Sequence, residues 1–263
     1  MNPKVAIIIS NYNYGPYVID AINSAISQDY VGDVRAYVLD DGSSDDSWDK
    51  ISAITDPIVA ENVEFQYYQG PLEHRQRDNI YAYRTTNSGA STARNVAIWH
   101  AWEWADVFGI LDADDLYHTN KVSVLLAKLM EHDEIGVAYG DYKIHRTFGH
   151  NDYIKYEAKP AYDRNILLQQ CMVHSGSLIK KQYLSQAILP NQEIFDSRLH
   201  GPGSEGFIGC VEDYDLWLRL SKLCMMTHVP EALSTVRETG QNQSMKMTTE
   251  IFNQHAPILI SRQ

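Results

Sequence analysis

The chain has 263 residues, 44% of them hydrophobic and 21% charged, a composition typical of a folded protein with a large core. Its 22 basic and 34 acidic residues give a net charge of −12, which argues against a nucleic-acid surface and against docking on anionic lipid. Its three cysteines are scattered without metal-ligand spacing, and no apolar run approaches the roughly 20 residues of a membrane span. We therefore predict a cytoplasmic protein that reaches the inner face of a membrane only through partners.

The first quarter of the chain alternates predicted strands with predicted helices. Residues 5–9 are apolar and β-branched, and a helix with apolar residues at helical spacing follows Pro16. A second strand at 35–39 precedes a helix for which Ser44 is the expected N-cap. This alternation predicts a parallel sheet. No Gly-x-Gly-x-x-Gly follows the first strand, so a dinucleotide site is not favoured.

A second helix start has the features of an anion site. We predict strands at 63–68 and 80–84, with a polar excursion at 70–79 between them. The polar stretch 87–95 then opens a helix that reaches about residue 104, with Ser91 as its expected cap and Arg94 in its first turn. Loose amides and an arginine at a helix N-terminus favour anion binding. The alternative is a capped helix with a surface arginine.

The most distinctive stretch is a short apolar run, 107–111, that ends in Asp112, Asp114 and Asp115. The run has the length of a buried strand, and ligands of open α/β sheets lie outside the carboxyl ends of the strands. Clustered carboxylates repel one another, so a divalent cation shared with a phosphate ligand is expected there. The alternative is a solvated acidic turn that caps the next helix.

The second half of the chain contains one further acidic pair. A helix at 120–131 and strands at 136–145 and 175–179 are predicted, whereas 146–165 shows no clear period. A glycine-rich loop, 196–210, leads into a helix that places Glu212 and Asp213 at its N-terminal end. Acidic residues in a first turn also suit the helix dipole, which is the alternative reading.

These motifs occur in an order that resembles a known family. In chain order they are Ser-Asn-Tyr-Asn from residue 10, Leu-Asp-Asp-Gly-Ser from 39, Asn-Ser-Gly-Ala-Ser-Thr-Ala-Arg-Asn from 87, Leu-Asp-Ala-Asp-Asp from 111 and Glu-Asp-Tyr-Asp-Leu-Trp-Leu-Arg from 212. Over roughly residues 4–240 the chain closely resembles family 2 of the inverting glycosyltransferases. The resemblance implies an α/β fold of the A type, Rossmann-like, with three α/β/α layers and a mostly parallel mixed central sheet. It also implies one catalytic domain over 1–240 and a C-terminal tail, 241–263, mobile over the active site.

The resemblance assigns the matching residues of the first three motifs to the nucleotide-sugar. Ser10, Tyr12 and Asp41 would line the base pocket, and Asp41 would accept from the imide if the base is uracil. Asn87 and Arg94 would lie near the nucleotide and its diphosphate.

The last two motifs are assigned to the metal and to catalysis. Asp114 would be the main ligand of Mn²⁺ or Mg²⁺, Asp112 would face the ribose or the metal, and Asp115 would be a second ligand or a sugar contact. Asp213 would be the catalytic base, with Glu212 beside it. Repulsion between these two carboxylates would raise the pKa of one of them.

The implied enzyme is a metal-dependent hexosyltransferase of polysaccharide or cell-envelope synthesis. It would move a sugar from a nucleotide-diphosphate sugar, a UDP-sugar, to a hydroxyl of a glycan or glycoconjugate by direct displacement with inversion. One departure concerns the metal: Thr239 stands where many relatives have a histidine two residues after an arginine, here Arg237. Two alternatives remain, a sugar-nucleotide-binding module without transfer and a haloacid-dehalogenase-type phosphatase, whose Asp-x-Asp would follow the first strand rather than a later one.

Overall fold

The computed structural model describes residues 2–64, 68–148, 151–174, 176–199, 211–240 and 256–261. Within these ranges the strands form one mixed sheet in the order β3-β4-β5-β2-β1-β6-β10-β8-β11-β7, with β9 paired to β8. The strands are β1 (Val5–Asn11), β2 (Val34–Asp40), β3 (Asp56–Glu64), β4 (Gln69–Arg77), β5 (Ile80–Arg84), β6 (Val107–Asp112), β7 (Leu116–Tyr117), β8 (Ile135–Phe148), β9 (Asn151–Glu157), β10 (Leu178–Lys180) and β11 (Met225–Glu238).

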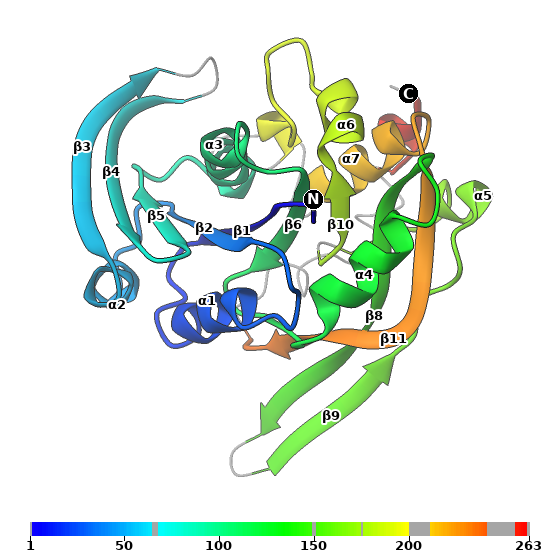
Figure 1. The fold of residues 1–263 in the computed structure, drawn as a ribbon, viewed down its shortest axis with the longest axis horizontal. Helices are drawn as coiled ribbons and strands as arrows, with labels where there is room; N and C mark the ends of the chain where they lie inside the picture. The colour runs from blue at the N-terminus through cyan, green and yellow to red at the C-terminus, as the bar shows by residue number, and fades with distance from the viewer. Residues whose placement is uncertain are drawn as a thin grey trace.

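Helices cover both faces of this sheet (Figure 1). The α-helices are α1 (Val18–Ile26), α2 (Ser47–Ala53), α3 (Ala90–Ala101), α4 (Lys121–Leu129), α5 (Arg164–Leu167), α6 (Lys181–Leu184) and α7 (Glu212–Leu220). One hydrophobic core joins the sheet to α3 and α7 and includes Trp217, while the other joins it to α1, α2 and α4 and includes Ile22 and Leu125. These two cores establish the expected three-layer α/β/α architecture.

The parallel centre of the sheet determines where polar strand ends meet. β1 pairs in parallel with β2 and β6, and β2 pairs in parallel with β5. Residues 5–9 of β1 are fully buried because both faces of this strand are covered. The register sets Ser10 opposite Leu39 on one side and Asp112 on the other, and Asn11 opposite Asp40. The first, second and fourth motifs therefore converge at one edge of the sheet.

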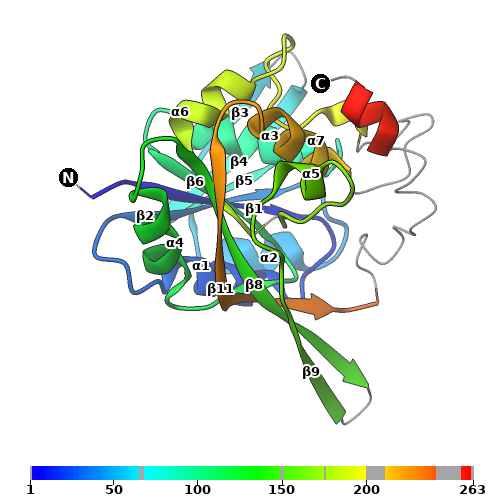
Figure 2. The same cartoon turned by 90° about the vertical axis from the view of Figure 1, so that its right-hand side faces the viewer.

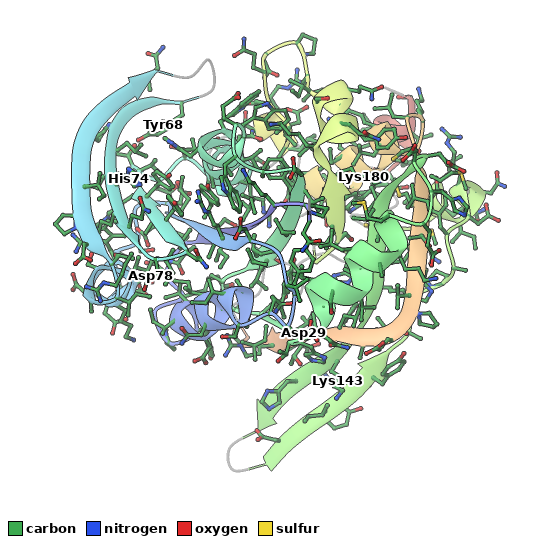
Figure 3. All side chains as sticks on the ribbon, in the orientation of Figure 1. Asp29, Tyr68, His74, Asp78, Lys143 and Lys180 are labelled. Carbon is green, nitrogen blue, oxygen red and sulfur yellow. The ribbon has the colours of Figure 1, made fainter. Side chains whose placement is uncertain are left out.

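Antiparallel strands extend the sheet beyond this centre. β10 joins β6 to β8 by antiparallel pairing. β11 runs parallel to β8, and its other edge pairs antiparallel with β7, next to the acidic motif. The ribbon of β8 and β9 extends away from the layered body (Figure 2). Side chains of the body pack between the layers, whereas Lys143 lies on this projecting ribbon (Figure 3).

Two predicted helix caps are wrong. Ser44 is not the cap of α2, which begins at Ser47 with Asp46 as its N-cap residue. Ser91 is buried inside α3, whose N-cap is Gly89, with φ 90°. The amides before α3 are bound instead by the distant side chain of Asp41, which a local capping pattern does not reveal.

Four strands were not expected from the sequence: β4, β7, β9 and β11. Residues 70–79, predicted as a polar excursion, lie largely in β4, and β9 occupies part of the segment 146–165 that shows no period. The described side chains of β9 are largely exposed, and β4 has one buried residue, Leu72, so neither β4 nor β9 carries the alternation of apolar and polar residues that a half-buried strand requires.

Part of the predicted tail and loop lies outside the described residues. This applies to 200–210 of the glycine-rich loop and to 241–255 and 262–263 of the tail. Residues 256–261 are helical, and Ala256 and Leu259 are buried in the core that contains α7. No helix in the described ranges is both long and apolar enough to cross a bilayer.

Candidate functional site

Arg94 of α3 joins the two acidic motifs of the chain. Its Nη2 donates to Oδ1 of Asp112 at 2.8 Å, and its Nη1 donates to Oε1 of Glu212 at 2.6 Å. Asp112 ends β6, and Glu212 begins α7, 100 residues further along the chain. The side chain of Arg94 is only 8% exposed, so this bridge is shielded from solvent. Acidic residues from two distant parts of the chain therefore converge on one guanidinium.

The carboxylates around Arg94 offset the effect of burial on its pKa. Burial lowers the pKa of its guanidinium, but Asp112 and Glu212 outweigh this effect and the pKa is raised overall. A buried arginine held by two carboxylates keeps its charge and fixes the distance between its partners. Arg94 was predicted near the diphosphate; in the structure its two terminal nitrogens point at carboxylates.

Asp213 lies beside this bridge at the start of α7. Burial raises its pKa to about 7, and the charge of Glu212 adds to this shift, whereas Arg94 opposes it. The backbone N–H of Tyr214 also donates to Oδ1 of Asp213 at 2.7 Å. The expectation that mutual repulsion raises one pKa of the pair agrees with this result. A carboxylate with a pKa near neutrality suits a general base.

The acidic turn after β6 is held by residues from both ends of the chain. Tyr14, from the loop after β1, hydrogen-bonds to Asp114 through its hydroxyl. The backbone N–H of Arg237, on β11, donates to Oδ1 of Asp115 at 3.0 Å, and its Nε donates to the carbonyl of Asp114. Arg237 also stacks over the ring of Tyr17, 4.8 Å from the ring centroid.

The carboxylates of this turn raise one another's pKa. Burial raises the pKa of Asp114 to about 7, together with the charge of Asp112. The pKa of Asp115 is raised by burial and by Asp114 and Asp112. Negative charge is thus concentrated where the parallel strands end, in the arrangement that a bound cation would relieve.

This donor set fits Mn²⁺ or Mg²⁺ bound together with a phosphate group. In the described ranges, no three His, Cys, Asp or Glu side chains are arranged as a complete metal cage. Magnesium bound with a nucleotide needs only one or two protein carboxylates, because phosphate oxygens and waters complete its shell. Asp112 and Asp114 would provide these carboxylates. Thr239 follows directly after β11, close in sequence to Arg237.

Asp41 organises the loop before α3. Its Oδ1 accepts the backbone N–H of Ser88 and its Oδ2 that of Gly89, both at 2.8 Å. Gly42 has φ +70°, and a Cβ there would lie 2.7 Å from the backbone N of Asn87. Asp41 was predicted to contact the base; in the structure it holds the loop that carries the exposed Asn87.

The remaining two predicted residues lie at the end of β1. Ser10 is half-buried between its partners Leu39 and Asp112, and Tyr12 is 46% exposed. Between them, Asn11 donates from Nδ2 to Oδ2 of buried Asp40 at 2.8 Å, which ties the ends of β1 and β2 together.

Three contributors to the site were not predicted from the sequence. They are Tyr14, which binds Asp114, and Asn11 and Asp40, which fix the strand ends. For Tyr14, the sequence offered one weak indication, its position in the polar loop after β1. The partners of Asn11 and Asp40 depend on strand register, which the motifs do not specify.

Comparisons with known proteins match most of this chain to one family. The family model described as "Glycosyl transferase family 2" matches residues 6–185. An uncharacterised glycosyltransferase of Nostoc sp. is 31% identical over 136 residues, which are 52% of this chain and 36% of that protein. The chain spans about a third of the length of the first curated relatives that it matches.

Solved structures share the fold. Residues 1–349 of TarS from S. aureus, crystallised with UDP, match 98% of this chain and 64% of that chain, with a TM-score of 0.64 and 17% identity. A mannosyltransferase of Pyrobaculum calidifontis in complex with GDP-Man and Mn²⁺ matches 100% of this chain and 69% of that chain, with a TM-score of 0.58 and 15% identity.

Proposed function

Because the chain belongs to glycosyl transferase family 2, we propose that it transfers a sugar from a UDP-sugar to a hydroxyl of a glycan or glycoconjugate with inversion at the anomeric carbon. The observation that carries this proposal is the Arg94 bridge. In this bridge one guanidinium binds Asp112, in the acidic turn, and Glu212, at the start of α7 next to Asp213. A donor diphosphate near Asp112 and an acceptor near Asp213 would then meet in one site.

The nucleotide would bind across the carboxyl ends of the parallel strands, as ligands of open α/β sheets do. Ser10 and Tyr12 at the end of β1 and Asn87 before α3 would contact the nucleoside. Asp41 would shape this pocket by holding the amides of Ser88 and Gly89. The UDP bound to TarS, a structure with the same fold, supports this choice of nucleotide.

Asp112 and Asp114 would hold the divalent cation that binds with the diphosphate. When bound, Mn²⁺ or Mg²⁺ supplies Lewis-acid stabilisation of the charge that develops on the leaving nucleoside diphosphate. The mannosyltransferase structure with GDP-Man and Mn²⁺ supports this assignment. Tyr14 and Arg237 keep the acidic turn in place through their bonds to Asp114 and Asp115.

Asp213 would accept the proton of the acceptor hydroxyl as that oxygen attacks the anomeric carbon. Its raised pKa, about 7, makes it a stronger base than an ordinary aspartate at neutral pH. Direct displacement needs one base and no covalent intermediate. Arg94 would keep Glu212 and Asp112 at fixed positions around the reacting centre.

Calorimetry with UDP tests the nucleotide and metal assignments together. We expect UDP to bind, Mn²⁺ to strengthen this binding, and Asp114→Ala to abolish the effect of Mn²⁺, because Asp114 is the proposed ligand. Asp49→Ala is the matched control, since it removes an exposed carboxylate from α2. UDP binding that a chelator leaves unchanged would contradict the metal assignment.

Hydrolysis of UDP-sugars without an acceptor separates an enzyme from a binding module. Slow release of UDP from one UDP-sugar, lost in Asp213→Asn while UDP binding is retained, is the expected result. Binding without any hydrolysis or transfer would instead favour a module that only holds the nucleotide-sugar.

A further inference from the structure

One segment of the chain, which we call the strap, binds both helices that carry the charged groups of the site. It runs from the 3₁₀-helix η1 (Ser185–Ala187) to the 3₁₀-helix η2 (Ser197–Leu199). η1 contacts α7, the helix that begins with Glu212, and η2 contacts α3, the helix that carries Arg94. The strap therefore connects the two helices that the Arg94 bridge joins at the site.

Asn95, which follows Arg94 on α3, binds the strap from one side. Its side chain is fully buried. Its Nδ2 donates to the carbonyl of Phe195 at 2.8 Å, and its Oδ1 accepts the N–H groups of Ile194 at 3.1 Å and of Phe195 at 2.9 Å. Since these backbone groups are buried, loss of the amide would leave them without a partner, which is costly.

Arg219, in the last turn of α7, binds the strap from the other side. Its guanidinium donates to the carbonyls of Ala187 and Ile194, and its Nε donates to Oδ2 of Asp215 at 2.9 Å. The Arg219 side chain is only 12% exposed. Ile194 is therefore bound by both helices, through its N–H to Asn95 and through its carbonyl to Arg219.

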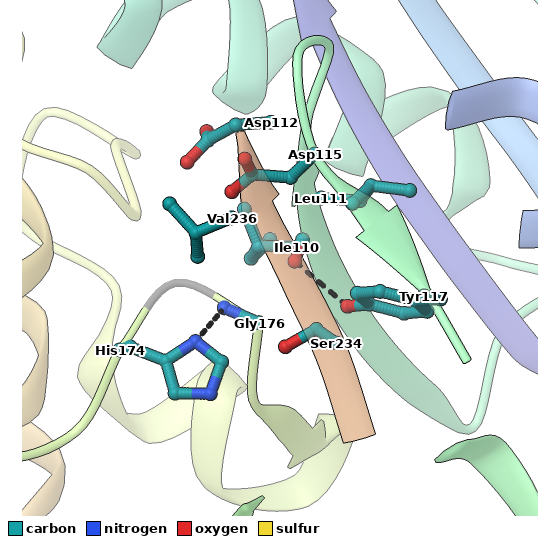
Figure 4. A pocket seen from close by; sticks show the side chains of 9 residues that line it. All are labelled: Ile110, Leu111, Asp112, Asp115, Tyr117, His174, Gly176, Ser234 and Val236. Carbon is teal, nitrogen blue, oxygen red and sulfur yellow. Dashed lines mark hydrogen bonds between the residues drawn. The ribbon is translucent and has the colours of Figure 1, made fainter. Parts of the chain in front are cut away.

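The strap also covers the Arg94 bridge. The ring of Phe195 is 1% exposed, and the guanidinium carbon of Arg94 lies 5.4 Å from the ring centroid. Through its bond to Asp112, Arg94 connects this ring to the acidic turn, where Asp112 and Asp115 line a small pocket (Figure 4). A hydrogen-bonded ion pair is stronger where water is excluded, so the Phe195 ring favours the bridge.

We propose that Asn95, Arg219 and Phe195 are positioning residues that set the distance between the acidic turn and the start of α7. Asn95 and Arg219 bind one stretch of backbone between their helices, and this backbone places the Phe195 ring on Arg94. The proposal deepens the proposed function and rests on it, because this distance affects a rate only if the two parts of the site act in one reaction.

Steady-state kinetics of sugar transfer separate a positioning role from a structural one. Arg219→Lys replaces a planar group that reaches three acceptors by a single point charge. Phe195→Leu keeps an apolar side chain but removes the ring from Arg94. We expect each variant to lower kcat roughly 10- to 100-fold, because misplacement of a catalytic group by about 1 Å costs up to about 100-fold. The KM for the UDP-sugar and the affinity for UDP should stay unchanged.

Arg198→Lys is the matched control for these kinetics. Arg198 also lies in the strap, but its side chain is 72% exposed, so this variant should keep the wild-type kcat and KM. If Arg219→Lys and Phe195→Leu reduce stability while the folded enzymes keep the wild-type kcat, the strap is only part of the core and the positioning role is rejected. A rise in KM at unchanged kcat would reject it as well.

A double-mutant cycle without ligands tests the shared binding of Ile194. Asn95→Ala removes the bonds from α3, and Arg219→Lys weakens those from α7. Because both side chains act through one residue, the double variant should lose less stability than the two single variants together, with a coupling of roughly three- to tenfold in the unfolding constant. The control cycle of Asn95→Ala with Arg198→Lys should be additive. Additive effects in the test cycle would overturn the proposal, and Asn95→Ser serves in both cycles if Asn95→Ala does not fold.

The two proposals fail in different ways. If the wild-type protein binds UDP but neither transfers nor hydrolyses any UDP-sugar, the proposed function fails, while the ligand-free cycle still decides whether Asn95 and Arg219 bind the strap jointly. If transfer is observed but the cycle is additive or kcat is unchanged in the variants, the proposed function stands and the positioning role is rejected.

Discussion

At the scale of single residues, Asp213 illustrates how neighbours adjust one carboxylate. It follows Glu212, whose charge is already taken up by Arg94, and it is not the carboxylate that Arg94 binds. Burial and the negative charge of Glu212 raise its pKa to about 7, while Arg94 opposes the shift and Asp112 adds to it. Two adjacent acidic residues thus take separate roles: Glu212 fixes the bridge, and Asp213 would be left to accept a proton.

This division of roles predicts a pH dependence. The value of kcat/KM for sugar transfer should rise with pH through about 7, because only deprotonated Asp213 accepts the acceptor proton. Asp213→Asn should lower transfer by about 10²- to 10⁴-fold and remove this limb of the profile, with UDP binding retained. Initial rates across neutral pH measure both effects. A profile of the same shape in the variant would assign the titrating base to another residue.

At the scale of elements, the loop between β5 and α3 depends on the close approach of two backbones. Gly42 has φ +70°, and a Cβ there would meet the backbone N of Asn87 at 2.7 Å. The same loop is held by Asp41 through the amides of Ser88 and Gly89. The nucleoside side of the site is therefore built from the turn after β2 as much as from the start of α3.

Gly42→Ala should therefore destabilise the fold and weaken UDP binding. The left-handed φ and the contact with Asn87 together should cost about 1–3 kcal/mol of unfolding free energy. Gly240→Ala is the control, because Gly240 also has a positive φ, +80°, but a Cβ there would have no atom within 4 Å. It should show only the backbone cost, roughly 1 kcal/mol, and unchanged UDP binding. Denaturation measures the unfolding free energy and calorimetry the UDP affinity. If Gly42→Ala and Gly240→Ala change both quantities equally, the contact with Asn87 is unimportant.

The sequence predicted the elements whose burial is regular. β1, β5, β6 and α7 follow from apolar runs or helical stripes, and acidic residues fall at the end of β6 and the start of α7 as expected. β4 and β9 were missed because few of their side chains are buried, so strand pairing rather than an apolar pattern defines them.

Within the site, the sequence indicated which residues would gather but not how they pair. The bridge from Arg94 to Asp112 and Glu212 joins positions 18 and 118 residues away from it. Burial of Lys121 was also not expected, because a lysine at the start of a predicted helix is normally solvated. Such contacts depend on tertiary packing, which local patterns do not encode.

At the scale of the whole molecule, the helical residues 256–261 pack into one of the two cores. Leu259 is fully buried in the core that includes α3 and α7, whereas its neighbour Ile258 is 43% exposed. The predicted tail therefore contributes a packed segment to the same layer that carries Glu212 and Asp213.

Leu259→Ala should consequently destabilise the entire fold. Loss of a buried leucine side chain costs about 2–5 kcal/mol, depending on how far the cavity collapses. Ile258→Ala, on the exposed side, should change the unfolding free energy by no more than about 0.5 kcal/mol. Chemical denaturation measures both values. A small effect for Leu259→Ala would mean that this segment does not hold the core together.

The bridge at Arg94 also sets a rule for building chimeras. The segment from β8 to the start of α7 enters the site through Glu212, which binds the guanidinium of Arg94 on α3. A swap of that segment from a relative, made to recruit a different acceptor, must therefore bring a glutamate to the start of its last helix. A chimera without it would keep the bond from Arg94 to Asp112 but lose the bond that links the exchanged segment to α3.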